Sequence, residues 1–202
     1  MSRIGLFGGT FNPPHLAHLR LATLAAEQCS LDEIIIMPTF LPPHKQASQL
    51  LSGEERMELC KYTFTSSVFS FSDFELKKGG KSYTVETLRH LKKSNPGDTL
   101  FLIVGSDMLL SFDRWYCWQE ILQLSRLIVL SREDEITQSE LSAYAERVLH
   151  LNRNEYDVLN CAPQTLSSTI IREKLQRGED VSSFLTPKAY QRILEKGYYR
   201  WT

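Results

Sequence analysis

Short apolar runs alternate with helix-like patterns along most of this 202-residue chain, and this alternation constrains the fold more than any other feature. The apolar runs are too short for helices and are predicted to be strands. Strands that alternate with helices favour repeated β-α units and a mainly parallel sheet. The predicted strands are Arg3–Phe7, Glu33–Met37, Phe69–Phe74, Thr99–Val104, Leu127–Leu130 and Asp157–Leu159. The predicted helices are Pro14–Gln28, Gly53–Phe64, Thr84–Lys93, Trp118–Leu124, Gln138–Leu149, Ser168–Arg177 and Pro187–Lys196.

We therefore expect an α/β fold, a Rossmann-like doubly wound and mainly parallel sheet whose last two helices pack on or beside it. No repeat or long linker divides the sequence, so residues 1–202 are predicted to form a single domain. Local signals support two helix starts: Ser52 with Glu55 predicts a capping box, and Thr186 before Pro187 predicts an N-cap. Gly178 and Gly197 suit helix ends.

Composition excludes several classes of protein. The formal net charge is −1, with 42% hydrophobic and 23% charged residues, which gives no bulk attraction to nucleic acid or to an anionic membrane. The four cysteines form no metal-type pattern, and no apolar stretch reaches the ~18 residues of a membrane span. With no signal peptide in the sequence either, we expect a reduced, cytoplasmic protein.

The first polar segment after a predicted strand is Gly8-Gly9-Thr10-Phe11-Asn12-Pro13-Pro14-His15, with His18 three residues further on. Glycines without Cβ atoms let backbone amides approach a ligand, and the helix that follows points its positive end at the same place. His15 and His18 are expected on one face of its first turn, as donors to phosphate oxygens. The alternative is that both histidines are ordinary surface residues of an amphipathic helix.

Two further segments contain potential anion ligands. In Pro42-Pro43-His44-Lys45, prolines stiffen a loop whose tip carries His44 and Lys45, unless this is a solvated basic turn. In Gly80-Lys81-Ser82-Tyr83-Thr84, backbone amides and the Thr84 hydroxyl are potential carboxylate donors, although a plain helix cap is equally common.

Three later segments complete the candidate site. Asp107, after Gly105 and Ser106, is predicted to accept from ribose hydroxyls or to cap the next helix. The aromatic run from Phe112 to Trp118 suits a hydrophobic core more often than a ligand platform. Ser167 and Ser168 precede a helix with Arg172 one turn inside, a second anion site suited to a polyphosphate tail.

Taken together, these segments resemble the nucleotidyltransferases of the H-x-G-H type, and among them the bacterial nicotinate-nucleotide adenylyltransferases. The opening Gly8–His18 segment is similar to the first family motif, and Pro42–Lys45 is similar to the second. Ser167–Arg172 resembles the closing motif, and the segments around Thr84, Asp107 and Trp115-Tyr116 match in order and spacing.

The resemblance implies transfer of AMP from ATP to nicotinate mononucleotide, giving deamido-NAD and pyrophosphate in NAD biosynthesis, with Mg²⁺ carried by the nucleotide phosphates and no metal ligands from the protein. It implies catalytic roles for His15, His18, Lys45 and Arg172. It further implies ATP binding by Gly8, Gly9, Thr10, Phe11, His15, His18, Gly105, Asp107, Ser167, Ser168 and Arg172. Binding of the mononucleotide is implied for Asn12, His44, Lys45, Thr84, Trp115 and Tyr116, with Trp115 stacked on the pyridine ring.

One position departs from the family pattern: Ala17 replaces the glycine between the histidines, and its methyl group is expected to crowd the nucleotide. A milder difference is Asn12, where the family has an acidic residue. Related adenylyltransferases that act on nicotinamide mononucleotide or phosphopantetheine are the enzymatic alternatives, and a non-catalytic nucleotide-binding module is a further one. A fragment of a class I aminoacyl-tRNA synthetase would need a basic tRNA-binding extension, which the sequence lacks. The sequence does not distinguish a monomer from a homo-oligomer.

Overall fold

The computed structural model describes residues 1–40, 50–132, 136–161 and 166–200. Its strands form a six-stranded, all-parallel sheet in the order β3-β2-β1-β4-β5-β6. This is the strand order of the doubly wound Rossmann-like fold, so the predicted fold class is confirmed. The strands are β1 (Arg3–Gly9), β2 (Glu33–Pro38), β3 (Phe69–Phe71), β4 (Thr99–Gly105), β5 (Arg126–Arg132) and β6 (Tyr156–Cys161).

The α-helices of the described residues follow the predicted alternation. They are α1 (Leu16–Gln28), α2 (Gly53–Thr63), α3 (Phe74–Lys78), α4 (Thr84–Ser94), α5 (Ser106–Leu109), α6 (Trp118–Leu124), α7 (Gln138–Arg147), α8 (Ser168–Gln176) and α9 (Pro187–Lys196). Two 3-10 turns, η2 (Phe112–Arg114) and η3 (Ser182–Phe184), complete them. None of these helices is long and apolar enough to cross a membrane.

The contacts of the chain group into two compact units. Unit 1 comprises Met1–Phe7, Thr23–Ile35 and Tyr83–Gln164, and unit 2 comprises Gly8–Ala22, Ile36–Ser82 and Thr165–Thr202. Each unit is described separately below. The expectation of a single domain over residues 1–202 stays a prediction.

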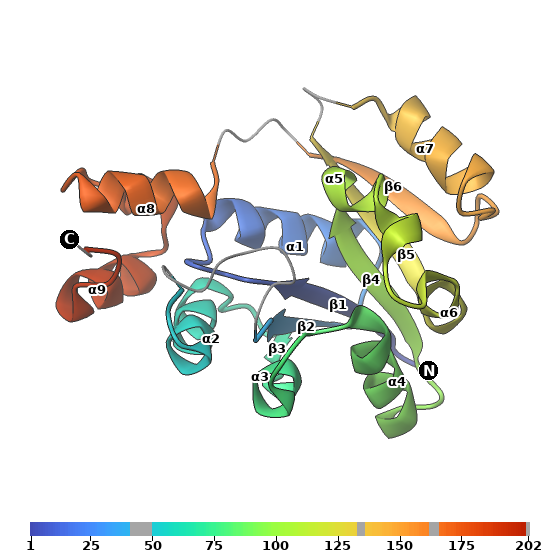
Figure 1. The fold of residues 1–202 in the computed structure, drawn as a ribbon, viewed down its shortest axis with the longest axis horizontal. Coiled ribbons are helices and arrows are strands. Elements are labelled where there is room, and N and C mark those ends of the chain that lie inside the picture. The colour runs from blue at the N-terminus through green and yellow to red at the C-terminus, as the bar shows by residue number, and fades with distance from the viewer. Residues whose placement is uncertain (41–49, 133–135, 162–165, 201–202) are drawn as a thin grey trace. The chain divides into compact units, whose positions relative to one another are not determined.

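Unit 1 contains the parallel pairs β1/β4, β4/β5 and β5/β6, with Leu6 opposite Leu102, Val104 opposite Val129 and Val129 opposite Val158. In β4, every residue from Leu100 to Val104 is buried. A continuous apolar run of this kind is typical of a parallel strand that is covered on both faces. Helix α4 packs against α6, while α7 packs against β6 and α5 (Figure 1).

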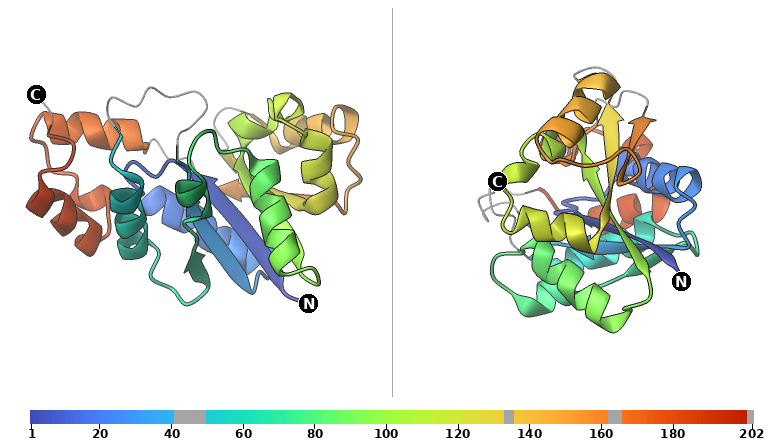
Figure 2. Two further views of the ribbon diagram at one scale, coloured as in Figure 1. Left: turned by 60° about the horizontal axis from the view of Figure 1, so that its bottom comes forward. Right: turned by 90° about the vertical axis from the view of Figure 1, so that its right-hand side faces the viewer.

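Unit 2 contains a core between α2, α8 and α9, which the left view of Figure 2 shows gathered together. The core is formed by Leu51, Leu59, Ile171, Leu175, Val181, Leu185, Ala189, Ile193, Tyr198 and Tyr199. An ion pair between Arg192 on α9 and Glu58 on α2, at 2.7 Å, lies beside this core. Helix α9, Tyr198 and Tyr199 are therefore packed into unit 2.

The predicted ends of several strands and helices differ from those in the structure. The strand predicted over Phe69–Phe74 ends at Phe71, because the Ser72 hydroxyl accepts the Phe74 amide N–H at 3.3 Å and starts α3. The first helix begins at Leu16, so His15 precedes it. The strand predicted over Leu127–Leu130 is longer at both ends, since β5 runs from Arg126 to Arg132. The predicted helices do not include α3 and α5.

The helix caps match the sequence signals in part. The predicted capping box of α2 is present, with Ser52 and Glu55 exchanging hydrogen bonds of 2.9 and 3.2 Å. Thr186 occupies the predicted N-cap position of α9, but its hydroxyl donates to the Tyr62 carbonyl at 2.9 Å. Gly197 ends α9 in the left-handed region, with a φ of 62°, where glycine is favoured.

Candidate active site

The segment from Gly8 to Pro14, in unit 2, comprises the last two residues of β1 and the turn after them, and we call it the phosphate loop after its predicted role. Gly8 is exposed, and a Cβ atom added there would meet only the Met37 carbonyl within 4 Å, at 3.9 Å. Space beside the Gly8 backbone is thus open, and its role in binding ATP stays a prediction. A Cβ atom at Gly9 would lie 3.1 Å from the Phe11 ring, which is 2% exposed, so Gly9 leaves room for a ring that supports the loop from inside.

The two histidines lie together where the phosphate loop enters α1. Their rings stack with 3.7 Å between centroids and an interplanar angle of 26°. His18 Nδ1 accepts the backbone N–H of His15 at 3.3 Å, and the Phe11 ring meets the His18 ring edge-on at 5.2 Å. The imidazoles therefore lie next to each other at a helix N-terminus, although His15 is not itself helical.

Asn12 connects the phosphate loop to two segments that are distant in sequence. Its side chain is buried, and its Oδ1 accepts the Leu51 amide N–H at 3.2 Å and the Tyr199 hydroxyl at 3.0 Å. Burial raises the pKa of Tyr199 well above its ordinary value, so this hydroxyl keeps its proton and donates. Asn12 thus fixes the loop from within unit 2, and its role in binding the mononucleotide stays a prediction.

The two serines at the start of α8 both make hydrogen bonds within unit 2. Ser167 caps the helix by accepting the Ile170 amide N–H at 3.3 Å. Ser168 donates its hydroxyl to the Pro13 carbonyl at 2.8 Å. The N-terminus of α8 is therefore attached to the phosphate loop, as expected if both contribute to one phosphate site.

Arg172 reaches the same loop from one turn inside α8. Its Nη1 donates to the Asn12 carbonyl at 2.8 Å, and its Nη2 donates to the Thr169 hydroxyl at 3.2 Å. Its buried Nε has no hydrogen-bond partner among the described residues. Unit 2 thus combines a guanidinium, a histidine pair, two helix N-termini and an open glycine backbone, which together can hold phosphate groups.

Unit 1 contains the residues predicted to bind the nucleoside. Asp107 is exposed in the first turn of α5, and a Cβ atom added to Gly105 would lie 2.6 Å from its Oδ1. Alanine at position 105 would therefore collide with the carboxylate. Gly105 occupies the N-cap position of α5, and Asp107 is the second residue of the helix, so Asp107 is not its cap. The exposed carboxylate is free of a cap role and suits acceptance from hydroxyl groups.

The aromatic residues of unit 1 belong partly to the core and partly to the surface. Trp115 stacks on buried Phe112 at 4.9 Å with an interplanar angle of 26°. Tyr116 is 58% exposed, lies 5.0 Å from the Tyr83 ring, and has its pKa raised by a hydrogen bond with Cys117. Thr84 is the first residue of α4 and does not cap it, because Tyr83 occupies the cap position.

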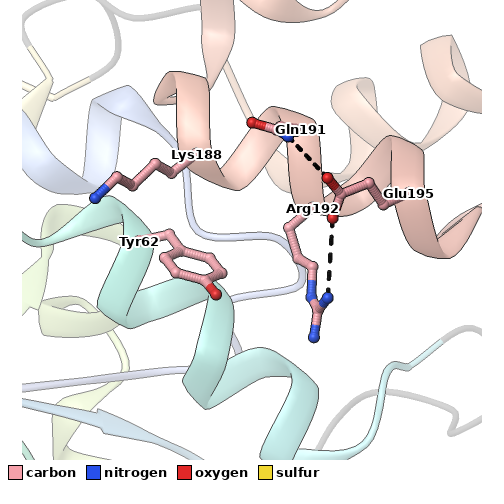
Figure 3. Close-up of a pocket in the computed structure, with 5 residues that line it drawn as sticks. All are labelled: Tyr62, Lys188, Gln191, Arg192 and Glu195. Atoms are coloured by element: carbon pink, nitrogen blue, oxygen red, sulfur yellow. Dashed lines mark hydrogen bonds and ion pairs between the residues drawn. The ribbon is translucent and has the colours of Figure 1, made fainter.

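His44 and Lys45 lie outside the described residues, so their predicted roles stay predictions. A surface pocket of about 280 Å³ lies between α2 and α9 (Figure 3). It is lined by Tyr62, Lys188, Gln191, Arg192 and Glu195. Because it contains no residue of the phosphate loop or of α8, this pocket is separate from the candidate site.

Two residues whose side chains form hydrogen bonds with the phosphate loop were missed at the sequence level: Arg56 and Tyr199. Arg56 is 1% exposed and donates to the Thr10 carbonyl at 2.8 Å. A detectable signal exists, since Arg56 shares the buried face of α2 with Leu59, Cys60 and Thr63 at helical spacing. A charged residue on an apolar helix face is unusual enough to be noticed. No comparable pattern marks Tyr199.

The doubly wound sheet and a phosphate loop with paired histidines define a class, the α/β nucleotidyltransferases. Residues 6–184 match the cytidylyltransferase-like family, and the chain belongs to this family. It is 36% identical over 200 residues to a probable nicotinate-nucleotide adenylyltransferase of Shouchella clausii, covering 98% of this chain and 97% of the relative. The corresponding protein of Clostridium botulinum is 38% identical over 206 residues, covering 99% of each chain.

A solved structure shares the fold. The nicotinic acid mononucleotide adenylyltransferase of Plasmodium falciparum, complexed with NaAD, superposes with a TM-score of 0.81 at 17% identity. The match covers 100% of this chain and 99% of that chain. At this identity the likeness supports the fold class alone.

Proposed function

We propose that this chain is a nicotinate-nucleotide adenylyltransferase, which transfers AMP from ATP to nicotinate mononucleotide. The products are deamido-NAD and pyrophosphate, and the activity belongs to NAD biosynthesis. The full-length relatives at 36% and 38% identity, both described as probable enzymes of this kind, support the substrate assignment. We expect it to act in the cytoplasm, in keeping with the thiols of its four cysteines.

The observation that carries this proposal is the attachment of Arg172 to the Asn12 carbonyl at 2.8 Å, across 160 positions of the sequence. This contact unites the first and the last predicted motifs in one unit, beside the histidine pair. Arginine presents planar donors that match phosphate oxygens, and Arg172 lies where the phosphate loop meets the N-terminus of α8. A triphosphate is the ligand that best fits such a set of donors.

In the proposed reaction, a phosphate oxygen of the mononucleotide attacks the α-phosphorus of ATP. A new P–O bond forms, the bond from the α-phosphorus to the α-β bridging oxygen breaks, and pyrophosphate leaves with the electron pair. Negative charge grows on the bridging and non-bridging oxygens, where donors from His15, His18 and Arg172 lower the barrier. ATP enters as its Mg²⁺ complex, the usual form in which this cation meets phosphate sites. Catalysis then consists of positioning and charge stabilisation.

The remaining predicted contacts select the substrates. Asp107 accepts hydrogen bonds from the adenosine ribose, with Gly105 leaving room for its carboxylate. Trp115 stacks on the pyridine ring, and backbone amides near Thr84 and Tyr116 receive the nicotinate carboxylate. Lys45, with Arg172, holds the β and γ phosphates in this proposal, and His44 assists with the mononucleotide.

The proposal is tested by incubating the protein with ATP and Mg²⁺ and following pyrophosphate release. Nicotinate mononucleotide, nicotinamide mononucleotide and phosphopantetheine are supplied separately. We expect release with nicotinate mononucleotide at a kcat/KM well above that of the other two. Preference for another acceptor would favour a related adenylyltransferase, and no release with any acceptor would favour a non-catalytic nucleotide-binding module.

A further inference from the structure

Arg56 lies beneath the phosphate loop and contacts three separate stretches of backbone in unit 2. Its Nη1 donates to the Thr10 carbonyl at 2.8 Å, its Nε to the Leu51 carbonyl at 3.0 Å, and its Nη2 to the Phe40 carbonyl at 3.4 Å. The side chain is 1% exposed. One planar guanidinium therefore fixes the phosphate loop relative to the residues after β2 and before α2.

The partners of Arg56 differ from those of an ordinary structural arginine. Arg192, which also contacts α2, forms a two-pronged ion pair with Glu58 at 2.7 and 2.9 Å. Within the described part of the chain, Arg56 has no carboxylate partner, and its donors meet backbone carbonyls. Burial lowers the pKa of Arg56, yet arginine stays charged at neutral pH.

A buried cation without a carboxylate is costly unless its hydrogen bonds or a nearby anion offset the cost. The carbonyl dipoles of Thr10, Leu51 and Phe40 provide part of this compensation. The phosphates of a bound nucleotide would provide more, since the positive charge lies directly under the loop that is proposed to hold them. The contact with Thr10 therefore links the charge of Arg56 to the phosphate loop.

We propose that Arg56 is a positioning residue for adenylyl transfer, which holds the phosphate loop in its reactive geometry through the Thr10 carbonyl. This inference rests on the proposed function. It assigns no direct contact between Arg56 and substrate; Arg56 acts through the backbone of Thr10 and through its charge. A loop that is misplaced by about 1 Å can cost up to ~10²-fold in rate, so the effect on kcat should be large.

The test compares Arg56→Lys and Arg56→Ala with the matched control Arg192→Ala. Lysine keeps the charge but cannot span three carbonyls, so Arg56→Lys should lower kcat by about tenfold or more, with a smaller change in the KM for ATP. Arg192→Ala removes the ion pair between α9 and α2, and should lower the melting temperature while kcat and KM remain those of the wild type. All rates are measured well below the melting temperature of the least stable variant.

A second readout separates positioning from stability alone. Low millimolar guanidinium chloride should restore part of the kcat of Arg56→Ala, because the ion can occupy the vacated site, whereas sodium chloride should not. Equal responses to both salts would contradict the inference. The wild-type enzyme should show no gain.

The outcomes distinguish the two proposals. An inactive wild-type protein would refute the proposed function itself. An active wild type with a folded Arg56→Lys variant whose kcat and KM are unchanged would overturn the positioning role alone. Loss of the fold in both Arg56 variants would also overturn it, by assigning Arg56 to stability only.

Discussion

Replacing Gly105 by alanine tests how closely the backbone of unit 1 is matched to the Asp107 carboxylate. Gly105 has a φ of −77° and a ψ of 161°, an extended conformation that alanine adopts without strain. The added Cβ would lie 2.6 Å from Asp107 Oδ1, whereas ordinary contacts begin near 3.4 Å. The carboxylate must therefore retreat by about 0.8 Å, a displacement of the size that disrupts precise ligand positioning.

We expect Gly105→Ala to weaken the hydrogen bonds between Asp107 and the adenosine ribose while the protein stays folded. Hydrogen bonds to a charged group contribute ~1.5–3 kcal/mol, and ~1.4 kcal/mol corresponds to a tenfold change in affinity. We therefore expect Gly105→Ala to raise the KM for ATP about tenfold, with little change in the KM for the mononucleotide. The assay follows pyrophosphate release while ATP is varied at saturating nicotinate mononucleotide.

Two controls make the result decisive. Gly97→Ala introduces the same methyl group in unit 1 at a position with nothing within 4 Å, and should leave both KM values unchanged. In an Asp107→Ala background, Gly105→Ala should have no further effect, because the collision partner is gone. A wild-type KM for ATP in Gly105→Ala, or additive effects in the double variant, would refute this account.

The remaining predictions concern unit 2. His18→Ala should lower kcat by at least ~10²-fold in the same assay, and near-normal turnover would remove its assigned role. Arg172→Ala should raise the KM for ATP about tenfold or more and affect the mononucleotide less; the reverse ranking would misplace the triphosphate. Ala17 is 1% exposed, so its methyl packs inside the protein. Ala17→Gly should therefore lower the free energy of unfolding by about 1 kcal/mol, as measured by urea or thermal denaturation. Tighter ATP binding by this variant would instead show that the Ala17 methyl group crowds the ligand.

The sequence was sufficient for the fold class because its signals are local. Buried strands such as Leu100–Val104 are continuous apolar runs, and the alternation with helices leaves few topologies. The prediction was wrong where a local polar contact overrides the pattern. The alternation of Phe69, Ser70, Phe71 and Ser72 predicts a strand, and the predicted strand extends to Phe74 although Asp73 breaks the alternation; the Phe74 amide instead donates to the Ser72 hydroxyl where α3 begins.

The candidate site residues that belong to sequence motifs could be named from the sequence. Those that reach the site only through tertiary packing could not. Histidines, serines and Arg172 belong to recognisable segments, so they could be named from the sequence. The contact of Tyr199 with Asn12 spans 187 positions, and no spacing rule foresees it. Arg56 is similar, because its three carbonyl partners come together only in the folded chain.

The hydrogen bond between the His15 amide and the His18 ring, at the start of α1, determines which ring nitrogen of His18 carries the proton. A ring nitrogen that accepts a hydrogen bond carries no hydrogen, so acceptance of the His15 amide N–H by Nδ1 assigns the proton of neutral His18 to Nε2. The first turn of the helix thereby selects one tautomer before any nucleotide arrives. This tautomer places the hydrogen of the neutral imidazole on Nε2, across the ring from the backbone contact.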